Sequence, residues 1–282
     1  FILFLLNIGI IHGFVGGGGG TEKILLTIIE ALEHSSHNVT LYSFSKPRLS
    51  YKNIKIKSII PVHIPLFGLY QRALESKLIS KAKDEDLLIQ TSGGLNLPKN
   101  PNQKIIVYCH GDFSNELYNP NTKYKGIWSL YYKSYLQIVE HFIDNILDSR
   151  IHLISNSKFT HDLIKSKYNK DSTIFYPPVN LNEFSPIEKE NSVVTIGRFS
   201  KEKNLEFGLN VMKDINSKYY IIGNTKTKTN LMYYEKLRSI IHDKYLNKNM
   251  NLLKNIERKK LINFLNTFLF KKFLLFLRPF GN

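Results

Sequence analysis

The residues with the clearest potential for chemistry are five consecutive glycines, Gly16–Gly20, followed directly by Thr21 and Glu22. The apolar stretch Ile8–Val15 before them predicts a β-strand, and the spacing of apolar residues after them predicts an amphipathic helix. The first backbone N–H groups of a helix have no partner within the helix and can bind an anion such as phosphate. Because the pattern lacks the Lys-Ser/Thr ending of a P-loop, a plain flexible turn is the alternative interpretation.

A second candidate is His110, which follows the predicted strand Ile105–Cys109. Residues just after the strands of a parallel sheet face the crevice in which ligands bind. A single histidine after a strand also serves as a structural hydrogen-bonding group, so both roles stay open. Asp112 has the same two interpretations, its structural one being the N-cap of the following turn.

The elements that must position these residues alternate along the chain. Six runs of apolar and β-branched residues predict strands: Val39–Phe44, Ile54–Ile60, Leu87–Gln90, Ile105–Cys109, Ile151–Ser155 and Thr173–Tyr176. Three stretches between them predict helices: Leu69–Lys83, Ile127–Leu147 and Thr160–Tyr168. This alternation predicts an α/β fold with a parallel sheet and helices on both faces.

A boundary is predicted at Tyr176-Pro177-Pro178-Val179, because two prolines end a strand and the polar stretch after them has no periodic apolar face. We therefore expect a first domain at 1–180, a linker at 181–192 and a second α/β domain at 193–282. The strands expected in the second domain are Val193–Gly197, Tyr219–Ile222 and Met250–Leu253.

Composition narrows the function classes. The single cysteine, Cys109, excludes an intramolecular disulfide and a cysteine zinc cluster, and makes a reducing compartment such as the cytoplasm the default. The formal net charge is +16. The lysines are scattered along the chain, whereas a nucleic-acid-binding protein is expected to gather its Lys and Arg on one face. We therefore favour attraction to an anionic membrane or to phosphorylated substrates over nucleic-acid binding.

Several segments, taken in order, resemble family 4 of the nucleotide-sugar glycosyltransferases, which have the GT-B fold. They are the glycine-rich turn with Thr21-Glu22-Lys23, Tyr108-Cys109-His110-Gly111, Ser155-Asn156-Ser157, Tyr176-Pro177-Pro178-Val179-Asn180 with Phe184, and Gly197-Arg198-Phe199-Ser200-Lys201-Glu202-Lys203-Asn204. Within the family, the multi-glycine turn and the Tyr-Pro-Pro segment look most similar to lipid-linked oligosaccharide mannosyltransferases. The resemblance implies two Rossmann-like domains with parallel sheets.

The resemblance also implies roles for particular residues. Arg198 and Lys203 match the diphosphate-binding Arg and Lys of the family, in a segment that begins at Gly197 and ends at Asn204. Arg offers phosphate oxygens a planar fork and Lys a point charge. Without the family match, both would be ordinary surface residues of a basic chain.

In the first domain, the resemblance implies that His110 contacts the transferred sugar or shapes the reaction centre, with Asp112 as its companion. Gly18, Gly19 and Gly20 would let the backbone approach the donor phosphates or the acceptor, and Thr21 would open the helix. The implied activity is transfer of a sugar, with mannose as a guess, from a nucleotide-sugar donor to a lipid-linked or glycan acceptor. The implied mechanism retains the anomeric configuration and uses no metal or other cofactor. The implied place of action is the cytoplasm, with peripheral contact at the cytoplasmic face of a membrane as one option.

The chain departs from the family near its end. Relatives continue past the segment matching Asn255–Leu261 to two glutamates eight positions apart, whereas here a Phe- and Leu-rich stretch, Phe268–Phe280, follows. We therefore expect an incomplete second domain. The alternative function is an inactive fragment that binds a nucleotide or a partner protein.

Overall fold

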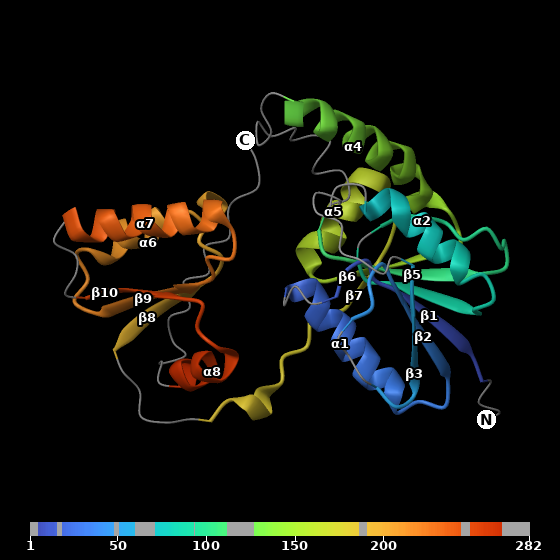
Figure 1. Ribbon diagram of the computed structural model, residues 1–282, viewed down its shortest axis with the longest axis horizontal. Helices are drawn as coiled ribbons and strands as arrows, with labels where there is room; N and C mark the ends of the chain where they lie inside the picture. Colours follow the sequence, from blue (N-terminus) through green and yellow to red (C-terminus); the bar gives the residue numbers. More distant parts are fainter. Residues whose placement is uncertain are drawn as a thin grey trace. The chain divides into compact units, whose positions relative to one another are not determined.

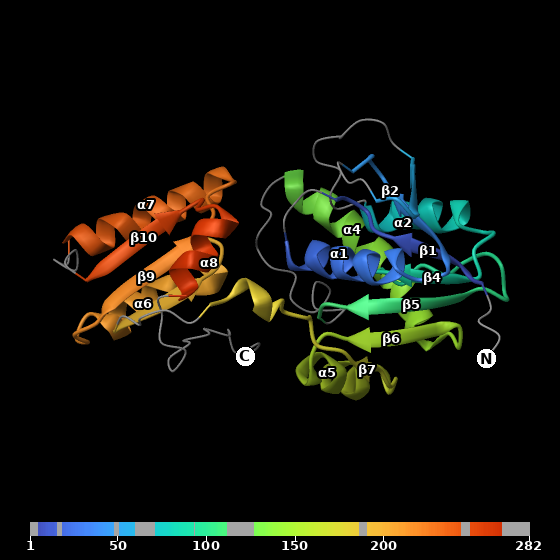
Figure 2. The ribbon, with the colours of Figure 1, turned by 90° about the horizontal axis from the view of Figure 1, so that it is seen from below.

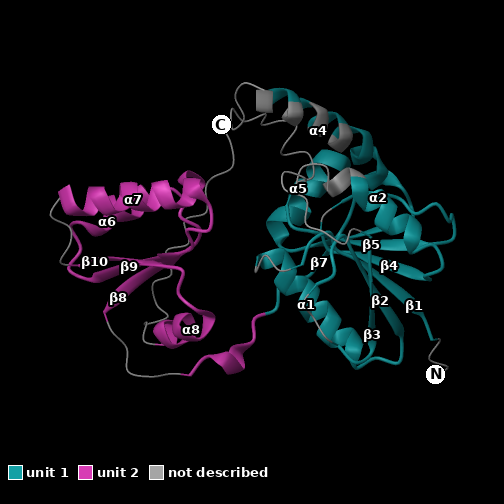
Figure 3. Cartoon of the chain, in the orientation of Figure 1, with its two compact units in different colours: residues 1–178 teal, residues 179–282 magenta. Residues whose placement is uncertain are grey.

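A computed structural model describes residues 5–15, 19–47, 51–59, 71–92, 94–111, 127–185, 191–243 and 249–266. The chain forms two compact units, Phe1–Pro178 and Val179–Asn282, shown in different colours in Figure 3. Each unit is built around its own parallel sheet.

Among its described residues, unit 1 contains a seven-stranded sheet in the order β3-β2-β1-β4-β5-β6-β7, in which every neighbouring pair is parallel. Its strands are β1 (Asn7–Ile11), β2 (Asn38–Ser43), β3 (Ile54–Ser58), β4 (Leu87–Gln90), β5 (Lys104–Cys109), β6 (Ile151–Ser155) and β7 (Thr173–Ile174). The order runs outward in one direction from β1 and in the other from β4. The point between these two strands is therefore the topological switch point of a doubly wound sheet.

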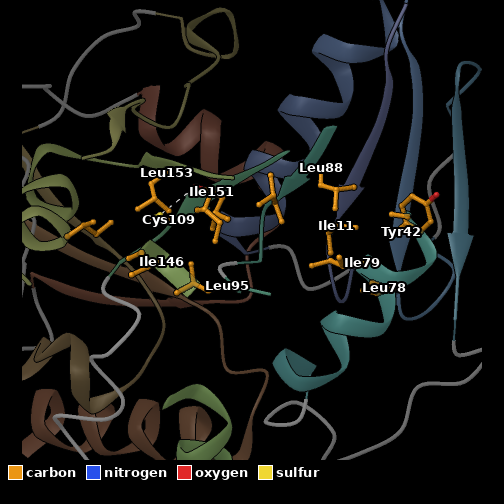
Figure 4. Close-up of a cluster of buried hydrophobic side chains, with 14 of the residues drawn as sticks. Ile11, Tyr42, Leu78, Ile79, Leu88, Leu95, Cys109, Ile146, Ile151 and Leu153 are labelled. Carbon is orange, nitrogen blue, oxygen red and sulfur yellow. Dashed lines mark hydrogen bonds between the residues drawn. The ribbon is translucent and has the colours of Figure 1, made fainter. Parts of the chain in front are cut away.

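Helices lie on both faces of this sheet (Figures 1 and 2). They are α1 (Gly20–Glu33), α2 (Gln71–Lys81), α4 (Ile127–Ile143), continued by the 3-10 turn η1 (Asp144–Leu147), and α5 (Lys158–Tyr168). Consecutive residues of a strand point to opposite faces. Accordingly, Ile10 packs in a cluster with Leu25 of α1, and Ile11 packs in another with Leu78 of α2. Figure 4 shows this second cluster, which continues across the sheet to Leu153 of β6.

Unit 2 contains a three-stranded parallel sheet among its described residues, in the order β10-β9-β8. The elements are η2 (Leu181–Glu183), β8 (Ser192–Ile196), η3 (Lys201–Lys203), α6 (Leu205–Met212), β9 (Lys218–Gly223), α7 (Lys228–Asp243), β10 (Met250–Lys254) and α8 (Arg258–Asn266). Val193 packs with residues of α6 and α7 on one face, and Val194 packs with residues of α8 on the other.

The prediction of an α/β fold with parallel sheets is confirmed. Several predicted elements differ in extent. The strand predicted at Ile8–Val15 spans only Asn7–Ile11, so His12 follows it. The strand predicted at Thr173–Tyr176 pairs only over Thr173–Ile174, and Tyr176 beyond it is exposed. The helix predicted at Ile127–Leu147 is α-helical only to Ile143. Within the described ranges, no helix combines the length and hydrophobicity needed to cross a bilayer.

Candidate functional site

Three polar residues lie directly after the strands around the switch point of unit 1. His12 follows β1, Thr91 follows β4 and His110 follows β5. Since β1, β4 and β5 are adjacent and parallel, these residues share the carboxyl edge of the sheet. In doubly wound folds this edge is where ligands bind.

Thr91 connects the two imidazoles. Its Oγ1 lies 2.7 Å from Nδ1 of His12, and its carbonyl oxygen lies 2.9 Å from Nε2 of His110. A carbonyl oxygen can only accept, so Nε2 of His110 carries the hydrogen and donates it. Thr91 is itself fixed to β1, because its backbone N–H donates to the carbonyl of Ile11 at 3.1 Å.

Burial favours the neutral form of both imidazoles. Burial lowers the pKa of His12 from 6.5 to about 4, an effect that the charge of Glu22 opposes and that of His110 reinforces. Burial also lowers the pKa of His110, and its hydrogen bond to Thr91 opposes that shift. With Nε2 as the donor, a neutral His110 has Nδ1 as a hydrogen-bond acceptor.

The glycine-rich turn lies at the same edge, between β1 and α1. Gly19 is the N-cap of α1 and makes no side-chain capping bond, and Gly20 is the first helical residue. A Cβ at Gly20 would have no atom within 4 Å, and Thr21 is exposed. The start of α1 is therefore open to an approaching group, with Glu22 in its first turn. Gly18 and Asp112, the other predicted site residues of this unit, lie outside the described residues.

The predicted site residues of unit 2 form a compact turn after β8. Gly197 donates its backbone N–H to Ile222 of β9 at 2.9 Å, and the Lys203 side chain folds back over Gly197, with Cγ 3.8 Å from the position of a Cβ there. Asn204 caps α6 in the left-handed conformation, with φ 45°, which asparagine tolerates better than most residues. The turn therefore places Arg198 and Lys203 near the carboxyl end of one strand.

The ends of all three described strands of unit 2 are tied together. A Cβ at Gly223 would lie 2.1 Å from the carbonyl oxygen of Gly197, so only glycine allows β9 to pass this close to the turn. Asn255, after β10, donates its backbone N–H to the Gly223 carbonyl at 2.8 Å and accepts from the backbone N–H of Thr225 at 2.9 Å. The carboxyl edge of this sheet is thus a linked set of backbone segments.

The charges on this edge are accessible to a ligand. Arg198 forms an ion pair with Glu202, and the two side chains are 61% and 43% exposed. Such an exposed pair contributes little to stability, so an anionic ligand could replace the carboxylate at small cost. Lys203 is exposed and makes no ion pair within the described part of the chain.

Where the structure describes the chain, no cluster of three or more His, Cys, Asp or Glu side chains is arranged to hold a metal ion. Of the predicted site residues, His110 lies at the carboxyl edge of the sheet in unit 1, and Gly197, Arg198, Lys203 and Asn204 lie in one turn of unit 2. The sequence analysis did not name His12 or Thr91. Thr91 directly follows a predicted strand, as His110 does, whereas His12 lies within the stretch Ile8–Val15 that was predicted as one strand.

Solved structures of glycosyltransferases share this fold. WaaG, described as a glycosyltransferase involved in lipopolysaccharide biosynthesis, matches 92% of this chain and 72% of its own, with a TM-score of 0.63 and 11% identity. HepE from Anabaena, in complex with UDP and glucose, matches 94% of this chain and 73% of its own, with a TM-score of 0.58 and 12% identity. The catalytic domain of starch synthase IV from Arabidopsis thaliana, bound to ADP and acarbose, matches 93% and 76%, with a TM-score of 0.55 and 10% identity. The fold is therefore of the GT-B type.

No curated protein matches this chain in sequence. The model of Glycosyltransferase Family 4 does match it, over residues 18–183, which is more than half of its length. The matched region extends from the glycine-rich turn through β7 to η2, and so includes Thr91 and His110. This chain therefore belongs to Glycosyltransferase Family 4.

Proposed function

We propose that this protein transfers a sugar from a nucleotide-sugar donor to a hydroxyl group of an acceptor, with the diphosphate of the donor bound by Arg198 and Lys203. The observation that carries the proposal is the turn after β8, in which Lys203 folds over Gly197 beside Arg198 and Gly223 holds the turn against β9. This segment offers two cations and a close-approaching backbone at the carboxyl edge of a parallel sheet, the edge at which open α/β sheets bind ligands. HepE, which has the same fold, has been solved with UDP-glucose.

The chemistry requires cations at this place. When the bond between the sugar and the diphosphate breaks, negative charge grows on the leaving phosphate. Arg198 and Lys203 of unit 2 would stabilise that charge. For unit 1, the resemblance implies that His110 contacts the transferred sugar, and its acceptor Nδ1 suits a hydroxyl group. The backbone N–H groups at Gly19, Gly20 and Thr21 are a further candidate site for an anion.

The finer parts of the proposal rest on resemblance. The multi-glycine turn and the Tyr176–Val179 segment favour mannose as the sugar and a lipid-linked or glycan hydroxyl as the acceptor. Retention of the anomeric configuration, independence of metal, and peripheral contact with the cytoplasmic face of a membrane belong to the same proposal.

The test measures both binding and turnover. Nucleoside diphosphate affinity and its release from a panel of UDP-, GDP- and ADP-sugars are compared among the wild type, Arg198→Ala, Lys203→Ala and Lys201→Ala. Loss of a charge-assisted bond to phosphate costs about 1.5–3 kcal/mol, so each of the first two changes should weaken binding about 10- to 100-fold. Lys201→Ala removes an exposed charge from the same turn and should change affinity less than about twofold.

Three results are distinguishable. The proposal is supported if the wild type releases nucleoside diphosphate from a nucleotide sugar and if Arg198→Ala and Lys203→Ala each abolish that release. Binding without release from any donor, in the presence of glycan and lipid-linked acceptors, would show a nucleotide-binding protein without transferase activity. Equal losses in all three variants would mean that general charge, and not this site, binds the nucleotide.

A further inference from the structure

A buried carboxylate lies near the carboxyl edge of the sheet in unit 1. Glu75 is on α2, its relative exposure is 0%, and it neighbours the core residues Leu78 and Ile79 of the same helix. Removing a carboxylate from water is costly unless hydrogen bonds compensate it, and an apolar side chain would pack at such a place without that cost. Its presence therefore calls for an explanation beyond filling the core.

Two partners of Glu75 are the residues on either side of Thr91. Gln90 donates from Nε2 to one carboxylate oxygen at 2.8 Å, and Ser92 donates from Oγ to the other at 2.7 Å. One rigid group on a helix thus holds both neighbours of the residue that binds His12 and His110.

The backbone closes over this arrangement at Gly94. A Cβ there would lie 2.1 Å from Oε2 of Glu75 and 2.3 Å from Nε2 of Gln90. The chain after β4 therefore passes directly across the carboxylate, and a larger residue at position 94 would displace the side chain of Glu75 or Gln90. Glu75, Gln90, Ser92 and Gly94 form a unit that we name the β4 clamp.

We propose that Glu75 is a positioning residue for the reaction, which acts through the β4 clamp to hold the Thr91 carbonyl against His110. The inference rests on the proposed function, because it assigns the clamp to the residue that would orient the sugar. Displacing a reacting group by about 1 Å can cost about a hundredfold in rate, so a clamp that holds the neighbours of Thr91 has a measurable effect.

The first variant is Glu75→Gln. The amide nitrogen has to donate, so it cannot accept from Gln90 or Ser92 as the carboxylate oxygen does. We expect kcat to fall about 10- to 100-fold while KM for the nucleotide sugar changes less than about twofold, since Arg198 and Lys203, the proposed diphosphate ligands, lie outside the β4 clamp. Glu30→Gln, the same change at an exposed position of α1, is the matched control and should leave both constants unchanged.

The second variant exchanges the two partners, as Glu75→Gln with Gln90→Glu. Here the amide introduced at position 75 is expected to donate from its nitrogen to the carboxylate introduced at position 90. Its oxygen is expected to accept from Ser92, so that both contacts are restored. The exchange should return kcat to within about threefold of the wild type, an interaction that a double-mutant cycle quantifies. The pKa of His110, followed by NMR, should shift in Glu75→Gln and return in the exchange variant.

The outcomes separate this inference from the proposed function. If the wild type releases no diphosphate from any donor, the proposed function fails, and the NMR titration of His110 alone decides whether the clamp positions it. If Glu75→Gln lowers the melting temperature but leaves kcat and the His110 titration as in the wild type, Glu75 is merely structural and the inference is overturned. Should Glu75→Gln not fold, Ser92→Ala, which removes one contact from a half-buried side chain, is judged by the same two readouts.

Discussion

At the scale of single residues, the neutral state of His12 has a thermodynamic consequence. His12 is 4% exposed and its pKa is about 4, against 6.5 for an accessible histidine. Between these two values the unfolded chain binds a proton at this residue and the folded chain does not. The free energy of unfolding must therefore fall as the pH falls from about 6.5 to about 4.

The shift corresponds to about 3 kcal/mol lost across that window. We expect urea unfolding at pH 7.5 and pH 4.5 to show this loss in the wild type. In His12→Gln, which cannot be protonated, the loss should be smaller by about the same amount. Parallel pH profiles for the two proteins would contradict the burial of a neutral His12.

At the scale of elements, the contact between β9 and the turn after β8 depends on Gly223. Gly223→Ala would place a methyl group 2.1 Å from the Gly197 carbonyl, so β9 or the turn has to move. Such overpacking costs about 1–3 kcal/mol. Because the turn carries Arg198 and Lys203, affinity for the nucleoside diphosphate should fall with it.

Urea unfolding, together with hydrogen exchange at the amides of β8 and β9, measures this effect. Gly20→Ala is the control for stability, since its methyl group meets no atom within 4 Å at the first position of a helix, where the change is less than about 1 kcal/mol. Unchanged exchange in Gly223→Ala would show that the two strand ends are not held in the way described.

The sequence predicted the helices and strands well where apolar residues follow a single pattern along the segment. The strands predicted at Leu87–Gln90 and Ile151–Ser155 coincide with β4 and β6. It overestimated the strand that begins at Thr173, because Phe175 and Tyr176 have the composition of a strand, whereas pairing with β6 extends only to Ile174. Apolar composition identifies residues suited to a strand but does not show where the partner strand ends.

The candidate site was predicted only in part, for a related reason. His110 was identified because it follows a strand in a segment that resembles the family. The contacts of His12 with Thr91, and of Glu75 with Gln90, depend on β1 and β4 being neighbours and on which face α2 covers. Periodicity gives the type of each element and not the order of strands in the sheet, so these pairs could not be read from the sequence.

At the scale of the whole molecule, the net charge of +16 should govern contact with membranes. Lys77, Lys81 and Lys83 are exposed in and just after α2, and a lysine near an anionic bilayer contributes about 1 kcal/mol. We expect binding to vesicles that contain phosphatidylserine at about 50 mM salt and its loss at about 300 mM, where the charges are screened.

Changing these three lysines to glutamine should weaken vesicle binding about 10- to 100-fold. The same change at Lys158, Lys165 and Lys167, which are exposed on α5, removes equal charge from another helix and serves as the control. Equal losses in the two triple variants would show that total charge, and no particular face, drives the contact. No sedimentation with vesicles at low salt would contradict the membrane proposal.

The adjacency of β1 and β4 also determines when, during synthesis of the chain, the candidate site can form. His12 and Thr91 are separated by 79 positions, and α1, β2, β3 and α2 all lie between them in the chain. Closing so large a loop is slow compared with forming local helices, and the pairing of β1 with β4 is among the most distant in unit 1. During synthesis on a ribosome, His12 therefore has no Thr91 to contact until β4 has emerged and paired with β1. A chain that has formed only its local helices lacks this edge of the sheet and the candidate site that it carries.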